Sequence, residues 1–230
     1  AIIVFPIPIT WIFIVIFSSE GIFSLAQNND IFFKNGSRNE KLIALTFDDG
    51  PHPKETYEIL NILNKYNVKA TFFVVGKHAN WYSKPLIEAS KEGHEIGNHT
   101  FSHPDISNLS SDDIKKEIKE CEDALIKLTG KKPTLFRPPY GSYGKDQLGE
   151  IAKECGYKII LWTSIDAKDW KNPPSAQISN TIINKVQNGD IILLHDYGTE
   201  NTVQALDVII PTLTKEGYKF VTVSELIGEN

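Results

Sequence analysis

Short apolar runs alternate with amphipathic stretches along most of the chain. Each apolar run precedes a stretch in which apolar positions recur roughly every three or four residues, the spacing of a helix with one buried face. This alternation predicts β-strands that return through helices, and therefore a mainly parallel sheet. The predicted strands are 42–47, 70–75, 95–97, 135–137, 159–162, 191–194 and 220–223, and the predicted helices are 55–66, 83–92, 111–128, 145–155, 174–187 and 202–215.

Helix 111–128 is the most clearly bounded of these elements. Ser110 or Ser111 can cap its first turn, Asp112 favours the positive end of the helix dipole, and Gly130 ends it. The number of strand and helix pairs exceeds what a small open sheet needs. We therefore predict an α/β fold in the form of a distorted, partly closed (β/α) barrel of about seven parallel strands, with an open parallel sheet as the alternative.

The first residues have a different character from the rest. Residues 1–17 are almost wholly apolar, which is typical of a signal-peptide core or a membrane anchor. A small-x-small triplet ending at Ala26 has the form that signal peptidases cleave. We assign 1–26 to a signal peptide or membrane anchor, any anchor lying within 1–19, and expect the protein outside the cell or on its surface. A buried helix of the domain is the alternative for this segment.

Polar residues dominate 27–40, which we assign to a linker, and the folded domain is expected over 41–228. A chain of 230 residues with 41% hydrophobic residues fits one such domain. The formal net charge of −5 argues against nucleic acid or anionic lipid as partner, so we expect contact with a membrane only through the N-terminal segment, and a monomer. Cys121 and Cys155 each share a helix face with apolar residues and are expected as core thiols, although a bridge between them stays open.

Polar and charged residues follow the predicted strands where each strand ends. In parallel α/β architectures the carboxyl ends of the strands share one edge, and sites are built there. We therefore expect these segments to meet at one opening, or mouth, at the carboxyl ends of the strands. They are Asp48-Asp49-Gly50, Asn98-His99, Arg137-Pro138-Pro139-Tyr140, Asp166 with Asp169-Trp170, and His195-Asp196.

His99 and His103 are spaced so that one turn of chain can point both imidazoles at one ion. A catalytic zinc-type centre has three protein ligands and an open position, and two histidines with one carboxylate are a known combination. Asp48 and Asp49 supply that carboxylate and a spare one. A cation beside this pair would relieve their repulsion and leave one carboxylate free to act as a base.

Each motif by itself has a simpler interpretation. An Asp-Asp-Gly sequence is most often a turn, and two spaced histidines are more often surface residues. The remaining histidines, His52, His78 and His94, are assigned no role. The argument for a site rests on the motifs occurring together, in order, at the ends of successive strands.

The ordered motifs resemble those of the polysaccharide deacetylases, the NodB-homology group also known as carbohydrate esterase family four. The resemblance covers roughly residues 41 to 226. It implies a distorted (β/α) barrel, a divalent metal, most simply zinc with cobalt or nickel possible, and removal of N-acetyl groups from chitin-like chains or peptidoglycan. The matching segments are Thr46-Phe47-Asp48-Asp49-Gly50-Pro51, His99-Thr100-Phe101-Ser102-His103, Arg137-Pro138-Pro139-Tyr140, Asp166-x-x-Asp169-Trp170 and Leu193-Leu194-His195.

The same resemblance implies a role for each residue of these motifs. It makes Asp48 the general base and His195 the general acid. The implied metal ligands are Asp49, His99 and His103, and the implied supporting residues are Arg137 beside Asp48, Asp169 beside His195, the backbone N–H of Tyr140 at the oxyanion, and Trp170 and Leu193 around the acetyl group. We add Pro139 and Tyr143 as substrate contacts because they lie in and just after the third motif.

Three other functions remain open from the sequence. One is a catalytically silent glycan-binding module on the same scaffold, and another is a domain in which the metal only staples the fold. The third is an O-acetyl xylan esterase that uses the same site. Exposed aromatic residues near the mouth could stack on sugars or simply pack, and the candidates are Trp81, Tyr82, Tyr143 and Tyr197.

Overall fold

The computed structural model describes residues 31–142, 147–163 and 165–229. An eight-stranded sheet forms its centre, in the order β1-β6-β5-β4-β3-β2-β7, with β8 paired to β2. Neighbouring strands are parallel throughout, as the sequence predicts. The strands are β1 (Phe32–Phe33), β2 (Leu42–Asp48), β3 (Thr71–Val74), β4 (Glu95–Asn98), β5 (Leu135–Phe136), β6 (Lys158–Ile160), β7 (Ile191–His195) and β8 (Lys219–Phe220).

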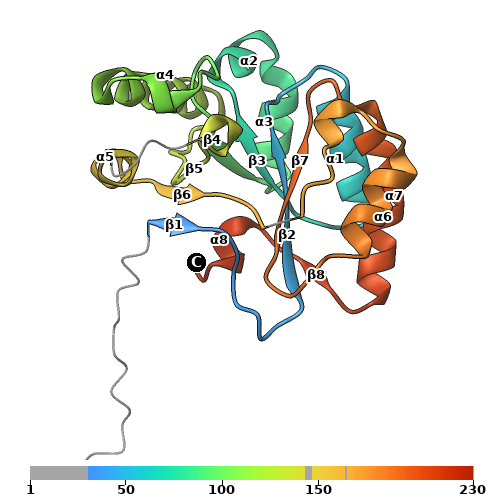
Figure 1. Ribbon diagram of the computed structural model, residues 1–230. Helices are drawn as coiled ribbons and strands as arrows, with labels where there is room; N and C mark the ends of the chain where they lie inside the picture. The colour runs from blue at the N-terminus through green and yellow to red at the C-terminus, as the bar shows by residue number, and fades with distance from the viewer. Residues whose placement is uncertain (1–30, 143–146, 164, 230) are drawn as a thin grey trace, which may run out of the picture.

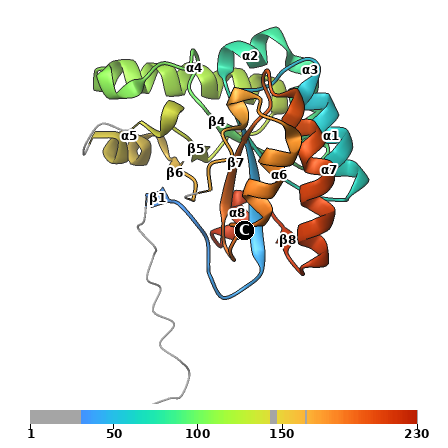
Figure 2. The same ribbon diagram turned by 45° about the vertical axis from the view of Figure 1, so that its right-hand side comes forward.

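The sheet curls into a half-barrel, which Figures 1 and 2 show from two directions. The segment after β6 completes the curl toward β7. Thr163 donates a backbone hydrogen bond to Ile191 at 3.1 Å, and Asp166 forms a parallel bridge with Leu193. The prediction of a partly closed parallel barrel is therefore confirmed.

Helices cover the outer face of the sheet, with α1, α6 and α7 together on the right in Figure 1 and α4 and α5 beside β4 to β6. Their buried faces pack on the central strands, as amphipathic spacing predicts. The α-helices are α1 (Glu55–Lys65), α2 (Gly76–Trp81), α3 (Ser83–Lys91), α4 (Ser111–Thr129), α5 (Gln147–Cys155), α6 (Ser175–Ile183), α7 (Glu200–Lys215) and α8 (Val223–Leu226), and 3₁₀ turns occupy Ile106–Asn108, Pro139–Gly141 and Asp169–Lys171.

Strand β2 shows how the sequence divides between core and site. Its residues are almost all buried, because a parallel strand is covered on both faces. Ile43, Leu45 and Phe47 pack outward against the helices. The alternate positions point into the barrel, so that Thr46 and Asp48 lie inside it, where both contact Arg137.

Helix α4 confirms the sequence-based bounds to within a residue. The Ser110 hydroxyl accepts a hydrogen bond from the Asp113 N–H at 3.2 Å, and Gly130 ends the helix with a φ of 72°. Cys121 is buried on this helix, and both it and Cys155 on α5 are free thiols, so the two are not bridged.

Three local predictions differ from the structure. Part of 27–40, predicted to be a linker, forms β1, because the backbone of residues 31–33 offers carbonyls that Ile159 and Leu161 bond at 2.7 and 2.8 Å. Helix α2 was not predicted, since it is a single short turn of largely polar residues. The predicted strand 220–223 ends early because a Thr222 capping box starts α8.

The residues of the predicted signal peptide or anchor lie outside the described part of the chain. Within the part that is described, no helix combines the length and apolar character needed to cross a bilayer.

Candidate metal centre and catalytic cleft

The predicted site segments meet at the carboxyl edge of the sheet. The register aligns Asp48 with His195 across β2 and β7, and Asn98 with Phe136 across β4 and β5. Residues that follow these strands therefore surround one hollow. The hollow is a cavity of about 420 Å³ lined by Asp48, Asp49, His99, His103, Tyr140, Trp162, Asp166, Trp170, Leu193 and His195.

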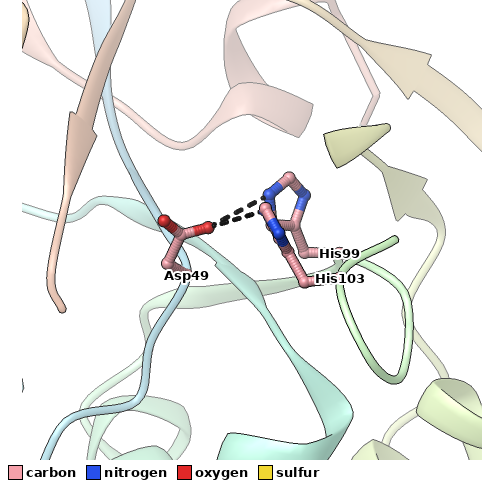
Figure 3. Close-up of side chains that lie close together, drawn as sticks. All are labelled: Asp49, His99 and His103. Atoms are coloured by element: carbon pink, nitrogen blue, oxygen red, sulfur yellow. Dashed lines mark ion pairs between the residues drawn. The ribbon is translucent and has the colours of Figure 1, made fainter. Parts of the chain in front are cut away.

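Asp49, His99 and His103 point toward one another on one side of this cavity (Figure 3). The Oδ1 atom of Asp49 lies 3.1 Å from Nε2 of His103 and 3.5 Å from Nε2 of His99. The three potential ligand atoms all lie within 4.8 Å of one another. This is the trio that the sequence predicts as metal ligands.

Left-handed backbone turns aim these side chains. Asp49, Thr100 and His103 have φ values of 75°, 67° and 60°, a region that residues with a Cβ seldom adopt. Side chains of the same loop hold it there: Oδ1 of Asn98 accepts from the Thr100 N–H at 2.9 Å, and the Thr100 hydroxyl accepts from the His103 N–H at 3.1 Å. Such conformations persist where the surroundings over-determine them, often at functional sites.

The donor set fits a divalent cation. His99 is buried, and its Nδ1–H donates to the Arg137 carbonyl at 2.7 Å, which leaves the Nε2 lone pair toward Asp49. Burial by itself would raise the pKa of Asp49, but the neighbouring imidazoles of His103 and His99 hold that pKa well below its usual range, so the carboxyl is ionised. Two imidazole nitrogens and one ionised carboxylate, with the cavity left on the open side, match a catalytic rather than a closed structural metal site.

Asp48 lies next to this trio and pairs with a buried arginine. Nη1 of Arg137 donates to Oδ1 of Asp48 at 2.7 Å and to the Thr46 hydroxyl at 2.8 Å. The guanidinium also bonds the carbonyls of Ile160 and Leu161 and is completely buried, with the Phe73 ring 4.1 Å away. A guanidinium keeps its charge even here, so this ion pair holds the Asp48 carboxylate in one orientation.

His195 lines the same cavity as the trio and is aligned with Asp48 across β2 and β7. Its Nδ1–H donates to Oδ1 of Asp169 at 2.8 Å, and its backbone N–H donates to Oδ2 of the same carboxylate. The Thr202 hydroxyl donates a further bond to that oxygen at 2.8 Å. Burial alone would lower the pKa of His195, but the Asp169 carboxylate outweighs it and raises the pKa to about 9. The imidazole is therefore poised to carry a proton.

Aromatic and apolar side chains complete the cavity. Trp170 and Leu193 line it where the sequence places them, and the Tyr140 ring lies 4.8 Å from the His103 ring. Trp162 also lines it, although the sequence pattern predicts Trp162 only as the last position of a strand and not as a site residue. The rule that nominated the other residues, position at a strand's carboxyl end, would have found it.

Of the two remaining predicted substrate contacts, only Pro139 lies in the described part of the chain. Pro139 is buried in a 3₁₀ turn and is absent from the lining. Its role as a substrate contact stays a prediction, and in this structure Pro139 belongs to the turn that presents Tyr140. Tyr143 lies outside the described residues.

Two residues that the sequence left without a role hold the turn that carries Asp49. Asp196 accepts from the Gly50 N–H at 3.0 Å and from the Thr56 hydroxyl at 2.6 Å, and burial raises its pKa to about 7. A Cβ on Gly50 would lie 2.1 Å from this carboxylate, so only glycine fits. Nδ1–H of His78 donates to the Asp49 carbonyl at 2.6 Å. Sequence pattern could not show these contacts, because they join segments far apart in the chain.

Comparison with known proteins gives one consistent result. Residues 35–160 match the sequence model of a family described as polysaccharide deacetylase. A peptidoglycan-N-acetylglucosamine deacetylase of Bacillus cereus is 45% identical over 192 residues, which cover 82% of this chain and 89% of that one. The peptidoglycan-N-acetylmuramic acid deacetylase PdaC of Bacillus subtilis is 43% identical over 189 residues, covering 82% of this chain but 39% of the relative.

A solved structure is similar throughout the fold. The crystal structure of the Bc1960 peptidoglycan N-acetylglucosamine deacetylase, in complex with a hydroxamate-type benzamide, aligns with a TM-score of 0.84 and 37% identity. The alignment covers 89% of this chain and 96% of that one.

Proposed function

This chain belongs to the polysaccharide deacetylase family, and from that premise we propose that it is a metal-dependent hydrolase that removes N-acetyl groups from glycans containing N-acetylglucosamine. One observation carries the proposal. The Asp49, His99 and His103 trio, an Asp48 paired with Arg137 and a proton-carrying His195 line the same cavity, and a purely binding module has no need of the last two. Peptidoglycan is the favoured substrate because the similar proteins are named for it. Chitin oligomers are the other substrate of this class.

Asp49, His99 and His103 would hold the metal, zinc being the first choice and cobalt or nickel the others. A divalent ion there supplies a Lewis acid that polarises the acetyl carbonyl and makes water acidic enough to attack at neutral pH. The Asp48 carboxylate lies beside this position and takes a proton from the attacking water. Arg137 keeps the carboxylate oriented while it does so.

Attack on the carbonyl carbon produces a tetrahedral oxyanion, and we assign the backbone N–H of Tyr140 to stabilise it. The C–N bond then breaks. An amine is a poor leaving group until it is protonated, and His195 donates that proton. Asp169 stabilises the protonated imidazole up to that step. The products are acetate and a free sugar amine.

Trp170 and Leu193 border the space between these groups and would enclose the acetyl methyl. The cavity volume of about 420 Å³ suits one sugar unit with its acetyl group rather than a long segment of chain. Export directed by residues 1–26 would place this chemistry at the cell wall. Both this export and the monomeric state remain predictions.

The alternative is an O-acetyl esterase that acts on xylan, because an ester needs no protonated amine to leave. The test is acetate release by the zinc-loaded chain from peptidoglycan, a chitin pentamer and acetylated xylan, with Asp48→Ala as the blank. The proposal is supported if the wild type releases acetate from the N-acetylated glycans and Asp48→Ala does not. Release from xylan alone would establish the esterase. No release from any of the three would leave a silent glycan-binding module.

A further inference from the structure

A single carboxylate on helix α4 holds the loop that joins the two histidines of the metal-binding trio. We call residues 99–103 the ligand loop, because a histidine of the trio stands at each of its ends. Oε2 of Glu117 accepts hydrogen bonds from the Phe101 N–H at 2.9 Å and from the Ser102 N–H at 2.8 Å. Its other oxygen, Oε1, accepts from the Ser102 hydroxyl at 2.7 Å. Both carboxylate oxygens of Glu117 are therefore bound to the ligand loop.

Helix α2 binds the carbonyl groups of the same loop. The Gly76 N–H donates to the Thr100 carbonyl at 3.0 Å, and the Lys77 N–H donates to the Phe101 carbonyl at 2.9 Å. Helices α2 and α4 lie side by side in both views of the fold (Figures 1 and 2). The two helices thus fix the ligand loop together, α2 through its carbonyls and Glu117 of α4 through its N–H groups.

The shape of the ligand loop needs such support. Thr100 and His103 have the left-handed φ values of 67° and 60°, which residues with a Cβ keep only where the surroundings over-determine them. The N–H groups of Phe101 and Ser102 lie between these two positions in the chain and belong to no helix or strand. Glu117 supplies their acceptor, and a carboxylate binds N–H groups more strongly than a neutral acceptor does. Removing it would leave the middle of the ligand loop to water.

We infer that Glu117 is a positioning residue for the metal site, which holds the ligand loop in the shape that aims His99 and His103 at one ion. This rests on the proposed function, in which the trio binds a divalent metal. A metal binds more tightly to ligands that are arranged before it arrives, since any ordering that binding has to bring about weakens the affinity. Glu117 does not line the cavity formed by the described residues, so it acts through the backbone of the ligand loop.

The test is the dissociation constant for zinc, measured by competition with a chelating indicator, in the wild type, Glu117→Ala and Glu117→Gln. Glu117→Ala removes all three bonds, and the zinc Kd should rise by about tenfold, the lower end of the effect of losing a group that orients metal ligands. Glu117→Gln keeps an oxygen for the two N–H groups and gains an amide that can donate to the Ser102 hydroxyl, so it should restore most of the affinity. A purely stabilising role would lower the free energy of unfolding and leave the Kd of the folded chain unchanged.

Glu120→Ala is the matched control, because it makes the same change on the same helix. Glu120 is exposed, and it pairs with Lys116 at 4.0 Å, one turn back on α4. Its substitution should leave the zinc Kd unchanged. A second variant covers the case in which Glu117→Ala does not fold by circular dichroism. In Glu117→Asp the carboxylate is one methylene shorter and cannot keep all three bonds, so zinc binding should weaken here too.

A wild-type Kd in folded Glu117→Ala, or in Glu117→Asp if the alanine variant does not fold, would overturn the inference and leave the proposed function standing. An equal rise of the Kd in Glu120→Ala would also overturn it, because the effect would then come from the helix and not from the bonds to the ligand loop. If the wild type bound neither zinc nor cobalt in the same assay, the proposed function and the inference would fail together.

Discussion

Strand β4 carries a buried histidine at each end, and the two have opposite properties. His94 directly precedes the strand, and Nδ1 of His94 accepts from the Ala70 N–H at 3.2 Å. Its Nε2 is buried without a hydrogen-bond partner in the described part of the chain. His99 follows the strand, and its Nε2 lies 3.5 Å from Oδ1 of Asp49. Both rings are buried to the same degree, so burial alone does not distinguish a structural from a functional histidine.

The difference is which edge of the sheet each residue occupies. At the amino edge burial lowers the pKa of His94 to about 4, helped by the charge of Lys69, and the ring stays neutral. At the carboxyl edge a carboxylate raises the pKa of His195 to about 9. Strand β7 repeats the contrast: Asp190 before it pairs with Arg38, whereas His195 ends it in the cavity. Chemistry is concentrated at one edge, and the other edge stabilises the fold.

The strongest test of this contrast is Asp48→Asn at the carboxyl edge. The amide keeps the shape but cannot take a proton, so we expect kcat to fall by roughly 10²- to 10⁴-fold. Arg137 loses its charged partner in this variant, so urea unfolding has to be followed alongside acetate release. A fall of less than tenfold in a folded variant would remove Asp48 from the role of base.

Asp169→Asn should change the pH dependence as well as the rate. The carboxylate raises the pKa of His195, so the wild type should lose its acid only as the pH rises through about 9. Without the carboxylate, the pH above which kcat falls should move down toward the ordinary histidine pKa of about 6.5. At pH 8 the variant should therefore have a kcat roughly tenfold to a hundredfold below that of the wild type. The profile of kcat against pH measures this shift. If that pH did not move, the acid would be another group.

His94→Asn should alter stability at low pH instead of activity. Because the folded pKa of His94 lies near 4, below the unfolded value of about 6.5, the unfolded chain binds more protons between these values, and stability is lost as the pH falls through that window. Across this window the wild type should lose on the order of 1–3 kcal/mol of its free energy of unfolding through His94. The variant should not lose this contribution, because it has no imidazole to protonate at this position. Urea unfolding at pH 7, 5.5 and 4.5 compares the two proteins. Equal pH slopes, or a tenfold loss of activity at pH 7, would contradict the division between edges.

Arg38→Ala should have the smallest effect. Arg38 pairs with buried Asp190, but its own side chain is 44% exposed, and solvent weakens such a pair. Asp190 also keeps its bond from the Gln187 N–H at 2.8 Å. We expect a loss of about 0.5–1 kcal/mol in urea unfolding and unchanged acetate release. A loss of activity here would mean that the amino edge influences the site.

Much of the fold and site could be predicted from the sequence because both follow from local rules. Apolar runs in alternation with helical periodicity determine a parallel sheet, and the carboxyl edge then gathers whatever follows each run. Strand ends and histidine spacing nominated His99, His103 and the Asp48-Asp49 pair, and the family resemblance singled out Asp49 as the ligand. The structure brings the ligand atoms of Asp49, His99 and His103 within 4.8 Å of one another. The metal and the catalytic roles of these residues remain proposals.

What the sequence did not predict depends on contacts between distant segments. Strand β1 is too short to show a pattern, and it exists because β6 offers it a partner. The support of the Asp49 turn by Asp196 and His78 joins three separate loops. The stacked rings of His78 and Tyr197 likewise meet only when α2 and the loop after β7 lie side by side.

The most direct test of the central claim is acetate release from peptidoglycan by the metal-stripped chain, before and after addition of one equivalent of zinc. The account predicts almost no release from the stripped chain and full recovery with zinc, and it predicts recovery to fail in His103→Ala. Undiminished release from the stripped chain would contradict it, because the trio at the carboxyl edge would then have no part in the chemistry.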